Sequence, residues 1–266
     1  MKKFILLFLF YSSFTYSQEK PIGEDAWTDL KTTFNYLFKG GLAQFKQKQN
    51  LAHMAVGVPA LWYSFEEDDR LSALLRSKKS NKVLDISGDL GVVLNFPIVP
   101  LTAYYLGRKN NDKKLVHFAM EYSASLYLAL AESGLISFIH VHERPDTSNT
   151  SVWEEAFRGD SSWPSGHVVP AATLTFKTLQ YYGPWWALIP GALTILTSYQ
   201  RVQDGKHYMS DVVGGILLSA LASEGVRAVA NNKENNSFYN WLYRHDAMVG
   251  LLRYKNAIGP RFSFNY

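Results

Sequence analysis

The 266-residue chain contains no cysteine, which excludes disulfides, zinc–thiolate centres and thiol nucleophiles. It also lacks an excess of either charge: 27 basic against 23 acidic residues give a formal net charge of +4, too little to indicate a nucleic-acid partner. No repeat or low-complexity tract is apparent. The hydrophobic fraction of 47% and the mean hydropathy of −0.12 are ordinary for a globular protein and low for a strongly multi-pass one. We therefore expect one domain with extensions.

The N-terminus is typical of an exported protein. A basic pair, Lys2 and Lys3, precedes an apolar run over residues 4–11, and small residues stand before Gln18. This pattern predicts a signal peptide over residues 1–17, whose removal would lower the net charge to +2. The alternative is an uncleaved anchor, but the apolar run is short for a span.

The remaining apolar segments have the lengths of helices. Residues 90–107 carry no charge, 115–141 are apolar apart from two glutamates, 178–200 are uncharged, and 212–223 form a shorter run. Their lengths are at the edge of what spans a bilayer. Two arrangements fit this composition: a helical bundle set in or on a membrane, or a soluble bundle whose apolar helices pack on each other. We predict an all-α fold, an antiparallel helical bundle, with membrane association as the favoured arrangement.

Three clusters of residues carry groups suited to phosphate chemistry. They are Arg144-Pro145, then Pro164-Ser165-Gly166-His167, then Arg201 with His207 and Asp211. Arginine presents a planar fork of donors that matches phosphate oxygens, and a glycine turn lets backbone N–H groups approach an anion. The predicted helix order brings all three clusters to one end of the bundle, as a single active site requires. The basic turn at 108–114 falls at the other end.

The third cluster has the spacing of a nucleophile and its orienting carboxylate. His207 and Asp211 are four residues apart, so they share one face of a helix. Asp211 can hold one ring nitrogen of His207 and leave the other free to attack phosphorus. His167 can protonate the leaving oxygen. Arg144, Arg201 and Gly166 can stabilise the developing charge, and Ser165 either shapes the turn or contacts phosphate.

This ordered set resembles the type 2 phosphatidic acid phosphatase and vanadium haloperoxidase superfamily, over about residues 86–230. The family pattern reads Lys-x6-Arg-Pro, Pro-Ser-Gly-His, Ser-Arg-x5-His-x3-Asp. Two positions depart from it: the lysine, which the family uses to contact phosphate, falls on Ser137, and the serine before Arg201 is Gln200. His140 or His142 could supply the missing charge; as a pair two residues apart they do not share a helix face, which disfavours a metal site.

The resemblance implies a phosphatase that needs no metal or other cofactor and works through a phosphohistidine. A lipid phosphate or pyrophosphate fits best, such as a phosphatidate, undecaprenyl pyrophosphate or a lipid A phosphate, hydrolysed in the cell envelope with the site facing the periplasm. Two alternatives stay open: a weakened lipid-phosphate-binding protein, because of Ser137, and a vanadium-dependent haloperoxidase, for which the chain is small. Besides the signal peptide, the domains expected are a helical extension at 18–85, the catalytic domain at 86–230, and a tail at 231–266 that packs on the bundle with a short strand near Phe262.

Overall fold

The computed structural model describes residues 25–77, 82–141, 143–146, 161–231, 236–244, 248–254 and 257–263. The predicted signal peptide therefore lies outside the described residues. The elements, in chain order, are α1 (Ala26–Ala43), the 3₁₀ turn η1 (Gln44–Lys46), α2 (Lys48–Arg76), α3 (Lys82–Val93), α4 (Ile98–Lys109), α5 (Lys113–Ser137), α7 (Val169–Tyr182), α8 (Pro184–Gln203), α9 (Met209–Ala230), α10 (Ser237–Arg244), β1 (Met248–Tyr254) and β2 (Ala257–Ser263).

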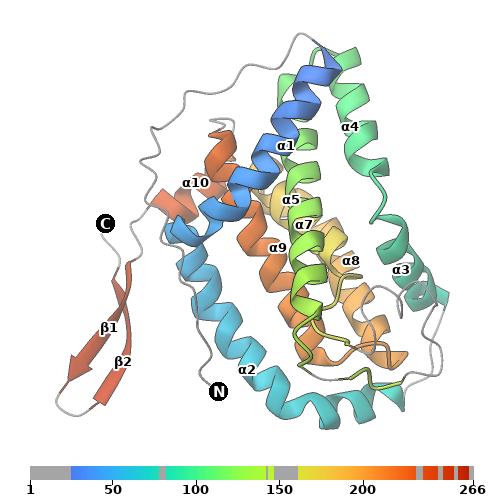
Figure 1. Ribbon diagram of the computed structural model, residues 1–266, viewed down its shortest axis with the longest axis vertical. Helices are drawn as coiled ribbons and strands as arrows, with labels where there is room; N and C mark the ends of the chain where they lie inside the picture. Colours follow the sequence, from blue (N-terminus) through green and yellow to red (C-terminus); the bar gives the residue numbers. More distant parts are fainter. Residues whose placement is uncertain are drawn as a thin grey trace, which may run out of the picture.

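The core is an antiparallel bundle of α5, α7 and α9, flanked by α1, α2, α4 and α8 (Figure 1). Local signals set the helix ends. Asp112 accepts the Leu115 N–H at the start of α5, and Pro184 occupies the first position of α8, where its missing N–H costs nothing. Gly183, at φ +89°, makes the reversal between α7 and α8. The all-α bundle predicted from the sequence is confirmed.

An aromatic cluster fills one part of this core. Phe118 stacks on Tyr122 with ring centroids 6.0 Å apart and meets Tyr181 edge-on at 5.6 Å. A buried ion pair lies beside it, because Lys177 Nζ donates to Glu121 Oε2 at 2.9 Å. Partnering of this kind is what allows a lysine and a glutamate to stay inside an apolar bundle.

The charge-free segment at 90–107 does not form one straight helix. It is divided between α3 and α4, which meet at an angle of 69°. Pro97 stands at the break and lacks the N–H that would continue the ladder of a helix. The two helices together have the length and composition of a membrane span with a break in it. Among the described residues, α9 is the one unbroken helix that is long and apolar enough to cross a bilayer.

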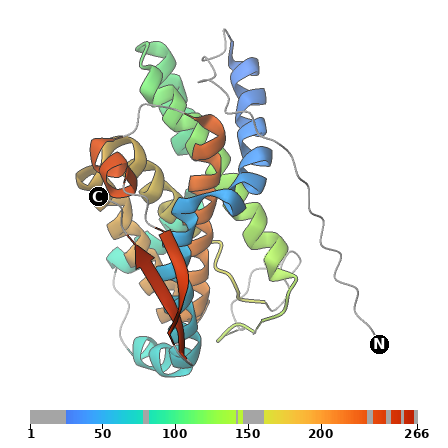
Figure 2. The ribbon, with the colours of Figure 1, turned by 90° about the vertical axis from the view of Figure 1, so that its left-hand side faces the viewer.

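The tail differs from the extended segment that the sequence predicted. It forms the helix α10 and then an antiparallel hairpin, in which Met248 pairs with Ser263 and Tyr254 with Ala257. Figure 2 shows this hairpin alongside α2, outside the bundle. The strand expected near Phe262 exists, but its partner is β1. The alternating pattern of the last residues gave no sign of that partner, because β1 is not alternating in sequence.

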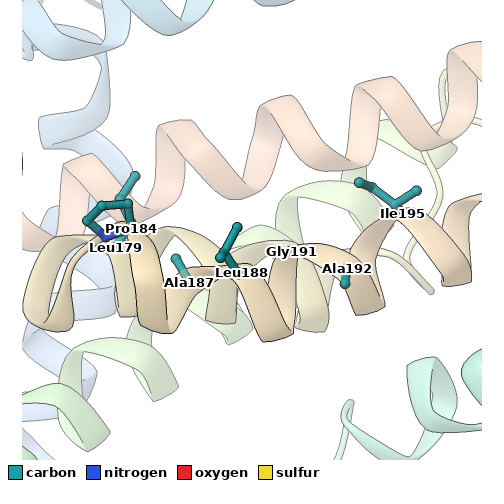
Figure 3. A pocket seen from close by; sticks show the side chains of 7 residues that line it. All are labelled: Leu179, Pro184, Ala187, Leu188, Gly191, Ala192 and Ile195. Carbon is teal, nitrogen blue, oxygen red and sulfur yellow. The ribbon is translucent and has the colours of Figure 1, made fainter.

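Large apolar side chains lie on the surface of several helices. On α8, Trp185, Ile189 and Ile195 are at least 70% exposed, and on α1 the same holds for Phe38. An open groove runs along α8 and reaches Leu179 near the end of α7 (Figure 3). Its lining residues are all apolar: Leu179, Pro184, Ala187, Leu188, Gly191, Ala192 and Ile195. So much exposed apolar surface is unusual for a protein surrounded by water on every side.

Candidate active site

His207 and Asp211 lie together at the N-terminus of α9, both fully buried. The Nδ1 atom of His207 is 3.2 Å from Asp211 Oδ2, and the same oxygen accepts the Tyr208 N–H at 2.8 Å. Asp211 is therefore both the capping carboxylate of the first turn and the partner of the imidazole. A carboxylate on Nδ1 favours the tautomer whose proton sits there, which leaves Nε2 with its lone pair.

His167 stands opposite His207, in the turn that leads into α7. Its Nδ1 atom is 3.4 Å from His207 Nε2, and the two rings meet at 62° with centroids 5.5 Å apart. The two histidines predicted as nucleophile and acid are thus neighbours in space, 40 residues apart in sequence. A distance of 3.4 Å is too short for a phosphorus atom between the two nitrogens, so attack through Nε2 requires the His167 ring to turn aside.

The Ser165-Gly166 turn is tied directly to α9. The Ser165 N–H donates to the Asp211 carbonyl at 2.9 Å, and Ser133 Oγ on α5 donates to the Pro164 carbonyl at 3.1 Å. Gly215 makes this approach possible, because a Cβ there would lie 2.4 Å from the Ser165 carbonyl oxygen. The second and third clusters of the sequence are therefore joined backbone to backbone. Ser165 is fully buried, and its Oγ has no hydrogen-bond partner among the described residues.

Arg144 follows α5 and reaches the loop between α8 and α9. It is 4% exposed, and its Nη1 lies 3.5 Å from the Lys206 carbonyl. The nearby Asp146 N–H donates to the Gly205 carbonyl at 2.9 Å, and a β-bridge joins Glu143 to Ser161. Arg144 is thus placed next to the loop that carries His207. The first cluster meets the third at the end of the bundle where α5 and α8 finish.

Arg201 lies in the last turn of α8 and packs on α3. Its Nε donates to the Gln200 side chain at 2.6 Å, and a Cβ on Gly88 would lie 2.6 Å from its Nη2. Gly91, one turn further along α3, would place a Cβ 2.9 Å from the His167 carbonyl. Two glycines of α3 therefore let this helix close against the site. The Arg201 carbonyl accepts the His207 N–H at 3.2 Å, so the same turn also fixes the His207 backbone.

One side of the site is built by a residue on α2 that was not among the predicted site residues. Asp68, on α2, accepts the Ser210 N–H at 2.9 Å and the Ser210 hydroxyl at 2.5 Å. Asp68 lies within the acidic run at residues 66–69, yet it is only 7% exposed. Burial raises the pKa of the Tyr208 phenol in the adjacent loop, and the Asp69 carboxylate adds to this shift.

Three residues were considered at or near the position of the missing lysine, and the structure describes two of them. Ser137, the last residue of α5, is buried, and its Oγ donates to the Gly134 carbonyl at 2.7 Å. His140 is exposed, and His142 lies outside the described residues. Within the described part of the chain, no three histidine, aspartate or glutamate side chains are grouped as metal ligands would be.

Comparisons with known proteins give a family match and a similar fold. Residues 115–234 match the sequence model of the PAP2 superfamily. No curated protein matches the chain in sequence. A solved structure has a similar fold: the first transmembrane PAP2 type phosphatidylglycerolphosphate phosphatase from Bacillus subtilis, 15% identical, with a TM-score of 0.50 over 70% of this chain and 97% of that one. The match to this superfamily thus covers the segment that carries all three clusters.

Proposed function

We propose that the protein is a phosphatase that hydrolyses a lipid phosphate or pyrophosphate through a phosphohistidine. The observation that carries this proposal is the contact of His207 with Asp211 on one ring nitrogen and with His167 on the other. The family match and the fold support a function of the lipid-phosphatase type. The apolar surface of α8 supports a substrate that resides in lipid, because Ile195 is six residues, about 9 Å of helix, from Arg201.

In the first half of the reaction, His207 Nε2 attacks phosphorus and the bond from phosphorus to the leaving oxygen breaks. Asp211 stabilises the positive charge that forms on the His207 ring. His167, in its protonated form and turned toward the leaving oxygen, transfers its proton there and becomes neutral. Arg144, Arg201 and the backbone at Gly166 neutralise charge on the equatorial oxygens.

In the second half, neutral His167 takes a proton from water as the water oxygen bonds to phosphorus. The bond from phosphorus to His207 Nε2 breaks, its electron pair returns to the ring nitrogen, and inorganic phosphate leaves. His167 ends protonated, ready for the next turnover. Each proton transferred in the first half is thereby recovered in the second, and the chemistry consumes only water.

The direct test is phosphate release from a panel of lipid and soluble phosphates by the purified protein in detergent, with and without EDTA. The panel includes a phosphatidate, undecaprenyl pyrophosphate, a lipid A phosphate, phosphatidylglycerol phosphate and a water-soluble phosphomonoester. We expect release from at least one lipid substrate, unchanged by EDTA. Activity that EDTA removes and a divalent ion restores would overturn the mechanism. No release from any substrate, together with phosphate-lipid binding, would favour the binding-protein alternative.

Vanadate gives a second test, because it adopts the five-coordinate geometry of phosphoryl transfer. We expect competitive inhibition, since the two arginines and the Gly166 backbone that would hold phosphate would hold vanadate as well. An enzyme indifferent to millimolar vanadate would argue against this pocket. Vanadate-dependent oxidation of bromide would instead indicate a haloperoxidase.

A further inference from the structure

α2 passes beneath the bundle at the end where α9 begins (Figure 1). It lies outside the segment that matches the family, yet its buried Asp68 makes two hydrogen bonds to Ser210, 142 residues further along the chain. One carboxylate oxygen accepts the Ser210 N–H and the other accepts the Ser210 hydroxyl. The Ser210 N–H is one of the first N–H groups of α9, which have no partner within the helix. A carboxylate there satisfies a donor and complements the positive end of the helix dipole.

A second contact comes from the same face of α2. Arg76 is eight residues, about two turns, after Asp68, and its Nη2 lies 3.5 Å from the Gly205 carbonyl. Gly205 has φ +67°, and a Cβ there would lie 2.4 Å from Arg76 Nη2, so a glycine suits both the conformation and the close approach. α2 therefore holds the loop that carries His207 at both ends, at Gly205 and at Ser210.

The contact at Ser210 leads directly to the reacting groups. Ser210 precedes Asp211, whose side chain contacts His207 Nδ1 and whose carbonyl accepts the Ser165 N–H. A shift of the first turn of α9 would therefore move the carboxylate that orients His207. Small displacements of this kind cost catalysis much more than they cost substrate binding when the binding groups are elsewhere.

We propose that Asp68 is a positioning residue for the phosphatase reaction, acting through Ser210 to hold Asp211 and His207 in place, with Arg76 as a second support. This inference rests on the proposed function. It assigns to α2 a part in positioning the site, whose proposed catalytic and phosphate-binding residues lie in the segment 115–234. Arg144 and Arg201, which would hold the substrate's phosphate, are carried by other elements: Arg144 follows α5, and Arg201 lies in the last turn of α8.

The first experiment compares kcat and KM on the best lipid substrate for the wild type, Asp68→Ala and Asp68→Asn, with Asp69→Asn as the matched control. Asp69 is the exposed neighbour on the same helix. We expect kcat to fall at least tenfold in Asp68→Ala and less in Asp68→Asn, which keeps one acceptor, while KM stays within twofold. Asp69→Asn should match the wild type. If both variants fold and kcat is unchanged in both, the proposal is overturned. If Asp68→Ala does not fold, the kcat of Asp68→Asn alone decides.

A double-mutant cycle tests whether the effect passes through Ser210. The loss caused by Asp68→Asn should shrink at least threefold in a Ser210→Ala background, because the hydroxyl that Asp68 binds is already gone. If the two losses in kcat simply multiply in the double variant, Asp68 does not act through the Ser210 side chain. That result would overturn the proposed action through Ser210.

A third measurement does not need activity. Amide hydrogen exchange of peptides covering residues 204–211, in the full-length protein, should be faster in Asp68→Ala than in Asp69→Asn. Equal exchange rates would overturn the positioning role even in an active enzyme. An inactive wild type with the expected exchange difference would sink the proposed function and leave the Asp68 contact established. The two failures are therefore distinguishable.

Discussion

At the scale of single residues, the site is a set of atoms placed to within hydrogen-bonding distance by short local contacts. Asp211 Oδ2 contacts the His207 ring and accepts the Tyr208 N–H, so one carboxylate fixes both the His207 side chain and the backbone of the loop that carries it. Both residues are fully buried, which strengthens the pairing because water does not compete for it. The division of roles between His207 and Asp211 can be tested by removing each one.

His207→Ala should abolish turnover, because it removes the nucleophile. Asp211→Asn should leave a folded enzyme whose kcat is lower by on the order of a hundredfold or more, as expected when the orienting partner of a catalytic histidine is lost. Steady-state kinetics on the best substrate, with circular dichroism as a check of folding, measure both effects. Wild-type rates in His207→Ala would rule out this residue as the nucleophile.

Ser137 is the residue at which a family lysine is missing, and its place on α5 can be inferred from a neighbour. Ser133 donates to the Pro164 carbonyl, so this face of α5 points toward the second cluster, and Ser137 follows one turn later on the same face. Ser137→Lys should therefore tighten vanadate binding. A charge-assisted hydrogen bond contributes about 1.5–3 kcal/mol, and a tenfold gain corresponds to about 1.4 kcal/mol.

The inhibition constant for vanadate measures this effect, and Phe138→Lys is the control, because Phe138 is 75% exposed and lies on another face. We expect the constant to fall tenfold or more in Ser137→Lys and to stay within twofold in Phe138→Lys. Unchanged or weaker inhibition in Ser137→Lys would show that residue 137 does not face the bound anion.

At the scale of whole elements, the close packing of α9 on the Ser165 turn depends on a glycine. A methyl group at Gly215 would lie 2.4 Å from the Ser165 carbonyl oxygen and 2.7 Å from Val168 Cγ2, so the backbone would have to move. Gly215→Ala should lower kcat at least tenfold and lower the melting temperature, because it separates Ser165 from Asp211. Gly191→Ala is the control, since its nearest neighbour would be 3.6 Å away. Equal kcat in the two variants would contradict this account of the packing.

The elements also show what the sequence could predict. The order of α5, α7, α8 and α9 follows from apolar runs bounded by Arg144, Gly183 and Arg201, and that order brings the three clusters to one end. The contact of Asp68 with Ser210 could not be predicted in the same way. A single aspartate within an acidic run has no periodic signal, and its partner is 142 residues away. The break between α3 and α4 was marked in the sequence only by Pro97.

The close packing of α3 against the site could not be predicted from the sequence either. Gly88 and Gly91 lie within the region that resembles the family but before the segment that the family model matches, at 115–234. Their role is visible only in three dimensions, where they make room for Arg201 and the His167 backbone. Glycines three residues apart within a helix predict close approach of some neighbour, but they do not identify it.

At the scale of the whole molecule, the two ends of the bundle differ in chemistry. One end gathers the two histidines proposed to be catalytic and both arginines. The other carries the basic segment 108–114, where Arg108 bonds to Asp29 at 2.5 Å and joins α4 to α1. The exposed apolar side chains of α1 and α8 lie between the two ends. So does α9, which among the described residues is the one unbroken helix with the length and hydropathy of a membrane span. A bilayer around this middle region would bury that apolar surface.

This arrangement predicts a membrane orientation, because basic segments are enriched on the cytoplasmic side. The end with residues 108–114 should face the cytoplasm, and the end with His207 should face outward.

The chain has no cysteine, so single introduced cysteines report their own position alone. We choose Lys109→Cys at one end and His140→Cys at the other, because both side chains are exposed and neither has a place in the proposed chemistry. In right-side-out spheroplasts, a membrane-impermeant maleimide should label His140→Cys, and should label Lys109→Cys only after the membrane is opened. The opposite labelling would place the site in the cytoplasm, and labelling of both cysteines in intact spheroplasts would mean that the bundle lies on the outer surface without spanning. Either result would overturn the predicted orientation while leaving the chemistry at His207 untouched, because that chemistry depends only on contacts within one end of the bundle.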